Sequence, residues 1–142
     1  MRVFLDVDDM ITGTGENYLR RSRSILVFCT EGYFESRNCM RELLRAVISK
    51  KPIICLLEPE GKRGGLTSDQ ILRRLKEAEH RYASWGLTDE VETWTREEGL
   101  GPLPSPEELH QDLFADSPIE WKCVRSRKTS QSVHSLRVTF VV

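Results

Sequence analysis

Two short runs of apolar residues constrain the fold of this chain more than any other feature. Residues 24–29 read Ser-Ile-Leu-Val-Phe-Cys, and residues 52–57 read Pro-Ile-Ile-Cys-Leu-Leu. Neither run alternates between apolar and polar positions, which is typical of strands covered on both faces, as in a parallel sheet. Segments with helical spacing follow both runs. The sequence therefore predicts an α/β fold, in which helices lie on the faces of a parallel sheet.

The helix after the first run has a clear start and a clear buried side. Ser36 is placed to cap it, because a serine hydroxyl can accept a hydrogen bond from a free backbone N–H of the first turn. Apolar residues at helical spacing form its buried stripe, namely Met40, Leu43, Leu44 and Val47. The remaining pattern predicts strands over 3–7 and 118–121, helices over 69–83, 88–98 and 106–114, and loops over 8–15, 30–35 and 58–65.

Length and charge indicate one compact domain followed by a different kind of segment. The chain has 142 residues, enough for one domain and not comfortably for two. Residues 122–142 carry five of the 21 basic residues and none of the 22 acids, which leaves 16 against 22 in residues 1–121. We therefore divide the chain into a domain over 1–121 and a basic C-terminal tail over 122–142. The final Leu-Arg-Val-Thr-Phe-Val-Val fits either a strand or a sticky tail.

Composition narrows the class of protein. No apolar run approaches the roughly 18 residues that a membrane-spanning helix needs, and charged residues interrupt the N-terminal apolar stretch where a secretory signal would lie. The four cysteines match no zinc or redox spacing, and Cys29 and Cys55 lie in apolar runs, as reduced core residues do. The net charge is −1. We expect a cytoplasmic protein with no membrane span and no nucleic-acid partner.

One acid stands out near the start of the helix predicted after residues 24–29. Glu42 lies about two turns into it and shares a helix face with Cys39. In an open α/β sheet such a helix begins at the carboxyl edge, where ligands bind. Two interpretations remain open: a surface glutamate that pairs with Arg41, Arg45 or the helix N-terminus, and a carboxylate that serves chemistry. Spacing alone favours the surface glutamate, because exposed glutamates are common.

A second group of acids follows the first predicted strand. Asp6, Asp8 and Asp9 could bind Mg²⁺, and the Asp-x-Asp arrangement resembles the first motif of haloacid-dehalogenase-type phosphatases. The final acidic pair of that family has no counterpart, and the spacing of the motifs is too tight. For Asp8 and Asp9 we favour solvated side chains, so no metal ligand is assigned. An Mg²⁺-dependent phosphatase is the weaker functional alternative.

An ordered series of residues resembles a TIR (Toll/interleukin-1 receptor) domain. The box Tyr33-x-x-Ser36-x-x-Cys39-x-x-Glu42-Leu43 resembles the family's Tyr-x-x-Ser-x-Trp-Cys-x-x-Glu-Leu box, with asparagine where tryptophan is usual. The series also contains 3–7, Gly13, Gly15, Ser22, 25–30 and 52–54, and less specifically 118–121.

The resemblance begins at the family's second strand. It implies a flavodoxin-like open parallel sheet with helices on both faces, that is, a TIR fold that lacks its first strand. The family's closing helix has no counterpart either. Because the first strand is central in the family's sheet, its absence predicts two strands with unpaired edges.

The resemblance implies an enzyme that cleaves NAD⁺ at the nicotinamide–ribose bond. It assigns the catalytic carboxylate to Glu42 and substrate binding to Asp6, Gly13, Ser36 and Cys39. A carboxylate suits this chemistry, because departure of neutral nicotinamide leaves an oxocarbenium-like ribose that a negative charge stabilises. NAD⁺ would be the substrate, and no further cofactor is implied.

The same resemblance implies a second function that does not need catalysis. In the family the loop after the residue that corresponds to Asp6 mediates self-association, so the expected protein partners are other TIR domains. The alternatives are therefore an NAD⁺ nucleosidase in signal transduction and a non-catalytic module that binds other TIR domains.

Overall fold

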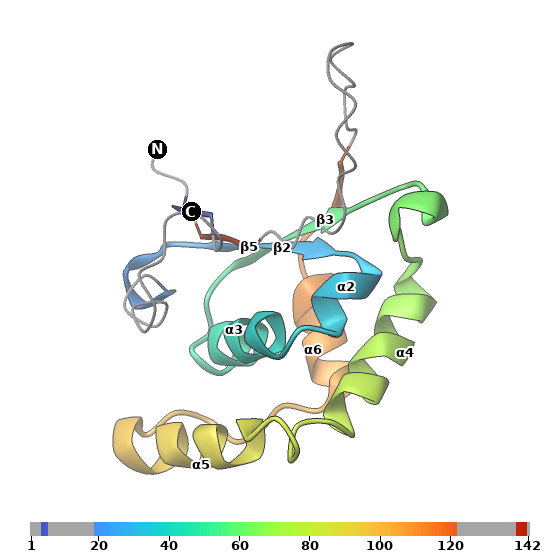
Figure 1. The fold of residues 1–142 in the computed structure, drawn as a ribbon. Coiled ribbons are helices and arrows are strands. Elements are labelled where there is room, and N and C mark those ends of the chain that lie inside the picture. The colour runs from blue at the N-terminus through green and yellow to red at the C-terminus, as the bar shows by residue number, and fades with distance from the viewer. Residues whose placement is uncertain (1–3, 6–18, 122–138, 142) are drawn as a thin grey trace.

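The computed structural model describes residues 4–5, 19–121 and 139–141 (Figure 1). Within these residues five strands form one sheet in the order β1-β5-β2-β3-β4. The strands are β1 (Phe4–Leu5), β2 (Ile25–Cys29), β3 (Ile53–Leu57), β4 (Ile119–Glu120) and β5 (Thr139–Val141).

The predicted parallel sheet is present at the centre of the fold. β2 pairs with β3 in parallel register from Ile25↔Ile53 onward, and β3 pairs with β4 in parallel at Leu56↔Ile119. Val27 and the other odd-numbered residues of β2 are fully buried, whereas the even-numbered residues are half-buried. One face of the sheet is therefore packed more tightly than the other. This confirms the predicted α/β class with an open, flavodoxin-like sheet.

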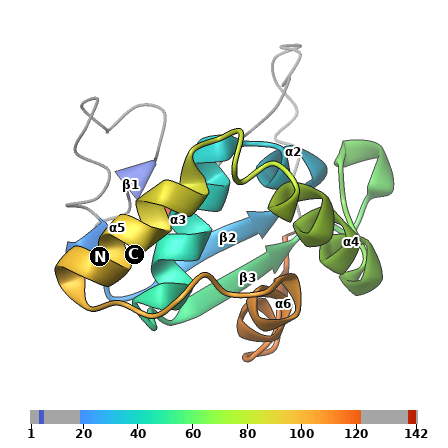
Figure 2. The ribbon, with the colours of Figure 1, turned by 90° about the horizontal axis from the view of Figure 1, so that it is seen from below.

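The described helices are α2 (Glu31–Phe34), α3 (Arg37–Ile48), α4 (Ser68–Glu79), α5 (Leu87–Glu98) and α6 (Pro106–Leu113), with a 3₁₀ turn η1 (Gly61–Arg63). The resemblance implies helices on both faces of the sheet, whereas the described helices α2 to α6 gather on one side of it (Figure 1). Seen from that side, they lie in front of β2 and β3 (Figure 2). The bounds of α3, α5 and α6 agree closely with the sequence pattern, whereas the helix predicted over 69–83 ends four residues early, at Glu79. A short helix and a 3₁₀ turn also lie inside the predicted loops over 30–35 and 58–65.

The unexpected helix α2 is explained by packing rather than by local sequence. Tyr33 and Phe34 are both buried, and their rings contact each other edge to face at 5.4 Å between centroids. Four residues are too few to form a stable helix by propensity alone. The buried aromatic pair therefore fixes this turn against the core, which a reading of turn residues could not reveal.

Three helices begin at side-chain caps, of which the sequence predicted the one at Ser36. The Ser36 hydroxyl accepts a hydrogen bond from the Cys39 backbone N–H at 3.4 Å. Thr67 and Ser105 form complete capping boxes at the starts of α4 and α6. Each cap satisfies N–H groups that have no partner inside the helix, and so defines where the chain turns into it.

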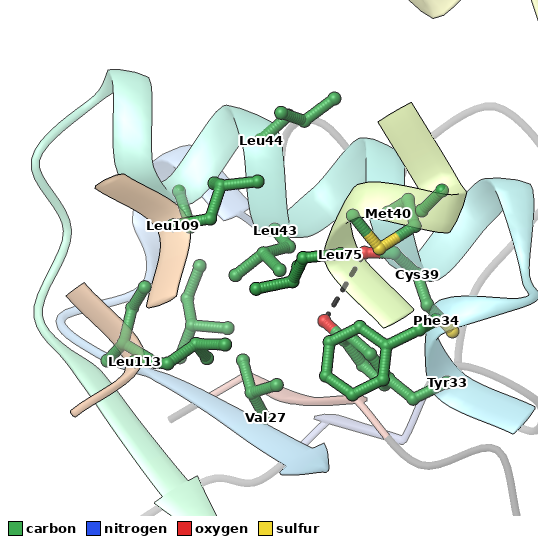
Figure 3. Close-up of a cluster of buried hydrophobic side chains, with 14 of the residues drawn as sticks. Val27, Tyr33, Phe34, Cys39, Met40, Leu43, Leu44, Leu75, Leu109 and Leu113 are labelled. Carbon is green, nitrogen blue, oxygen red and sulfur yellow. Dashed lines mark hydrogen bonds between the residues drawn. The ribbon is translucent and has the colours of Figure 1, made fainter. Parts of the chain in front are cut away.

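The core lies between the sheet and the first layer of helices (Figure 3). α3 contributes the predicted stripe, and α4 and α6 close the cluster from the side. The labelled side chains at its centre are Val27, Met40, Leu43, Leu44, Leu75, Leu109 and Leu113, all of them at most 1% exposed.

The C-terminal strand lies inside the sheet, between β1 and β2. β5 runs antiparallel to β2, with Ile25 opposite Val141, and antiparallel to β1, with Phe4 opposite Val141. From the sequence, the C-terminal segment could be either a strand or a tail. In the structure, Thr139–Val141 form a strand. Residues 139–141 therefore pair with both β1 and β2.

Two buried tyrosines allow a paired test of the packing. The Tyr33 hydroxyl donates a hydrogen bond to the Cys39 carbonyl at 3.2 Å. In the described part of the chain the Tyr82 hydroxyl has no hydrogen-bond partner, and its burial, helped by the charge of Glu79, raises the pKa of Tyr82 above its ordinary value.

We expect opposite effects when each tyrosine loses its hydroxyl. Tyr33→Phe should lower the free energy of unfolding by about 1 kcal/mol, because the hydrogen bond is lost. Tyr82→Phe should raise it, because an unsatisfied buried polar group disappears. Urea unfolding of the two variants and the wild type measures both changes. A destabilised Tyr82→Phe variant would show that this hydroxyl is satisfied after all.

Candidate functional site

The candidate site is built where the chain leaves β2 and enters α3. α2 follows β2 after a single residue, and Ser36 then caps α3 as predicted. Cys39 is almost completely buried, and its carbonyl accepts the hydrogen bond of the Tyr33 hydroxyl (Figure 3). The first turn of α3 is therefore fixed at its cap and again at its inner side.

Glu42 lies on the second turn of this fixed helix and is only 7% exposed. This burial contradicts the interpretation of Glu42 as an exposed surface glutamate. Two neighbouring arginines of α3, Arg41 and Arg45, form ion pairs with Glu90 and Glu98 of α5. Glutamate side chains are rarely buried to this degree in folded proteins.

The predicted site residues divide into two groups. Ser36, Cys39 and Glu42 lie together on the first two turns of α3 and its cap. Asp6 and Gly13, which the resemblance assigns to substrate binding, lie outside the described residues. The structure therefore brings together the half of the site that the helix carries.

A row of arginines on α3 was not recognised as functional from the sequence. Arg37, Arg41 and Arg45 are spaced four residues apart, so their side chains share one face of the helix. On α5, two glutamates and a tryptophan have the same spacing and face them. Arg37 and Arg41 both bind Glu90, Arg45 binds Glu98 at 2.5 Å, and the guanidinium groups of Arg41 and Arg45 lie 5.5 and 4.8 Å from the Trp94 ring centroid.

Arg45 is the most buried member of this row. Its side chain is 4% exposed and contacts both the Trp94 ring and the Glu98 carboxylate. The hydrogen bond from Arg45, supported by the charges of Arg45 and Arg20, holds the pKa of Glu98 below its ordinary value of 4.5. A guanidinium that is flanked by a ring face and a carboxylate is well suited to join two helices.

The lowered pKa predicts how the α3–α5 contact responds to acid. A carboxylate with a depressed folded-state pKa stabilises the fold above its unfolded pKa, and this stabilisation is lost as pH falls through the folded value. Wild type should therefore be more stable than Glu98→Gln near neutral pH. The difference should shrink as pH falls through the folded-state pKa of Glu98, which lies below 4.5. Urea unfolding at neutral pH and over a series of acid pH values tests this; a difference that does not shrink in acid would contradict it.

Two cysteines from neighbouring strands also meet, although their sequence spacing gave no sign of a pair. Their Sγ atoms lie 3.4 Å apart, at hydrogen-bond distance, and both side chains are buried. The hydrogen bond with Cys55 and the burial of the side chain both raise the pKa of the Cys29 thiol. Cys29 and Cys55 are free thiols, which confirms the prediction of reduced core residues.

A serine and a histidine meet on the surface, again without a signal in the spacing. The Ser68 Oγ lies 2.9 Å from the His110 Nε2, and the His110 ring packs on Phe114 at 4.7 Å between centroids. Nucleophilic catalysis by such a pair needs a third group that orients the imidazole. Over the described part of the chain no carboxylate binds His110, so we assign the pair to the packing of α4 against α6.

The described residues offer neither a metal centre nor a membrane-spanning helix. No group of three or more His, Cys, Asp or Glu side chains among them could hold a metal ion. Likewise, none of the helices in this part of the chain is long and apolar enough to cross a membrane. Asp6, Asp8 and Asp9, the acids of the phosphatase alternative, lie outside the described residues.

Comparisons of the chain with models of known protein families, with curated proteins and with solved structures gave no match.

Proposed function

We propose that this chain is a TIR-type NAD⁺ nucleosidase in which Glu42 carries the reaction. The observation that supports this most is the burial of Glu42 on the second turn of α3. The helix follows β2 at the carboxyl edge of the parallel strands, where α/β folds bind their ligands. An ordinary solvated glutamate would not be buried at such a place.

The reaction requires mainly one negative charge placed close to the reacting ribose. When the bond between nicotinamide and ribose breaks, nicotinamide leaves as a neutral molecule and positive charge develops on the ribose. The Glu42 carboxylate stabilises that charge or traps the sugar. Water, or a hydroxyl of the product itself, then attacks the anomeric carbon. Two products, hydrolysed and cyclised, are compatible with this scheme.

The other assigned residues bind and orient the substrate. Ser36 and Cys39 fix the start of α3, so that the direction of the Glu42 side chain is set before substrate arrives. Asp6 and Gly13 are proposed to hold the ribose and the nicotinamide. The protein would act in cytoplasmic signal transduction, with association between TIR domains as a means of control.

A non-catalytic TIR-binding module is the second candidate, and one observation favours it. Ile119 and Trp121 are 54% and 45% exposed, at and just after β4, the last strand of the sheet order. Trp121 contacts Phe28 edge to face at 6.3 Å between centroids. Exposed large apolar side chains beside an open strand edge are common in protein–protein contacts.

Release of nicotinamide from NAD⁺ distinguishes these functions. The whole chain is incubated with NAD⁺, dilute and under crowding, and free nicotinamide is measured by chromatography. Nicotinamide release that is insensitive to EDTA supports the nucleosidase. If none is released under any condition, the catalytic proposal is wrong and the binding module is favoured. EDTA-sensitive phosphate release from a phosphate ester would favour the phosphatase.

A further inference from the structure

Helix α5 forms a layer of its own. The sheet is covered by α2, α3, α4 and α6, and α5 lies beyond α3, on the side away from the sheet (Figure 1). The view from below agrees, since α5 passes in front of α3 (Figure 2). Removing α5 from this arrangement would leave the sheet and its first layer of helices in contact.

Ion pairs form much of the contact between α5 and α3. The Glu90 carboxylate forms ion pairs with both Arg37 and Arg41, and its side chain is 26% exposed. Leu87, Val91 and Trp94 add a buried apolar side. The ion pairs are partly open to water, so they weaken with ionic strength, whereas the apolar contacts do not.

Both ends of α5 are glycines in the left-handed region. Gly86 has φ +70° and Gly99 has φ +66°, and a Cβ built at either position would meet nothing within 4 Å. Crowding therefore does not require glycine there; the backbone conformation does. A residue that accepts both signs of φ at each end of a helix can absorb the rotation when the helix moves as a unit.

We propose that α5 is a clamp helix, which opens from α3 as a unit and controls how firmly the helix that carries Glu42 is held. Its Glu90 and Glu98 carboxylates and its Trp94 ring grip the arginine row at both ends of α3. The opening stands on the contacts alone. Its effect on Glu42, which is one residue from Arg41, rests on the proposed function.

Hydrogen–deuterium exchange of the whole chain, followed by mass spectrometry, tests the opening. At low salt the amides of α5 should exchange as a group, faster than those of β2 and β3. Glu90→Gln removes two ion pairs, so exchange in α5 should rise about tenfold while β2 and β3 stay unchanged. Raising the salt concentration in the wild type should act in the same direction.

Glu97→Gln is the matched control. Glu97 is on the same helix and has the same charge, but among the described residues its one ion pair is with its neighbour Arg96, at 3.8 Å, and both side chains are exposed. Exchange in this variant should equal that of the wild type. If α5 exchanges only together with β2 and β3, or if both variants behave alike, the clamp is wrong.

Nicotinamide release by the Glu90→Gln variant tests the regulatory step separately. A changed rate or KM alongside faster α5 exchange supports the control of Glu42 by α5. An unchanged rate with an open α5 overturns that control and leaves the clamp intact. If the wild type releases no nicotinamide, the proposed function and the regulatory step fail together, while the exchange experiment still decides the clamp.

Discussion

Glu42→Gln is expected to abolish the release of nicotinamide from NAD⁺. The amide has the shape of the carboxylate but no charge, so it cannot stabilise the positive ribose that forms as nicotinamide departs. Loss of one such electrostatic contact typically costs about 10²–10³-fold in rate. Because Glu42 is buried, the position is also sensitive to polarity. The isosteric substitution is therefore preferred to alanine.

The matched control is Glu58→Gln. Glu58 is also a buried glutamate, 6% exposed, but it follows β3 and its Oε1 accepts a hydrogen bond from the Glu60 N–H. A glutamine can accept the same bond, so the fold and the rate should both persist. Activity retained by Glu42→Gln, or lost equally in both variants, would remove Glu42 from the catalytic role. Circular dichroism confirms that each variant is folded.

Gly65→Ala is expected to lower the free energy of unfolding more than an alanine at any other glycine of the described residues. A Cβ at this position would lie 2.2 Å from the Glu58 carbonyl oxygen and 2.8 Å from that of Glu60. These are backbone atoms of the turn after β3, so relief requires the chain itself to move. Overpacking of this kind typically costs about 1–3 kcal/mol, occasionally more.

The clash has a structural consequence beyond its energy. Gly65 forms an isolated bridge with Thr30, so the turn after β3 is fastened to the end of β2, next to the start of α2. The control is Gly61→Ala, where the added Cβ meets nothing within 4 Å. Its free energy of unfolding should stay within about 0.5 kcal/mol of the wild type. Equal urea midpoints for the two variants would show that the turn yields easily.

The regular elements could be predicted because their signals are local. The apolar runs predicted β2 and β3 to within one residue at each end, and the Ser36 cap predicted the start of α3. α5 was predicted within one residue although its stripe is weak. α2 was missed, because only the burial of Tyr33 and Phe34 makes four residues into a helix.

The candidate site was only half predictable for the same reason. Ser36, Cys39 and Glu42 are close in sequence, so the helical repeat alone places them on adjacent turns. The burial of Glu42 was not predicted. The partners of the arginine row were not predicted either, because they lie 49 or more residues away along the chain. The pair Arg41 and Glu90 is one example. The spacing of Glu90, Trp94 and Glu98 was a visible signal, but nothing in it named α3 as the partner.

The α/β class, the positions of most helices and strands, and a carboxylate on the helix after the second strand follow from the amino-acid sequence. These depend on the periodicity and capping of neighbouring residues. The pairing of β5 between β1 and β2, the burial of Glu42 and the packing of α5 across α3 arise only in the folded chain. Those outcomes depend on contacts between distant residues, whose free energies a local pattern does not contain.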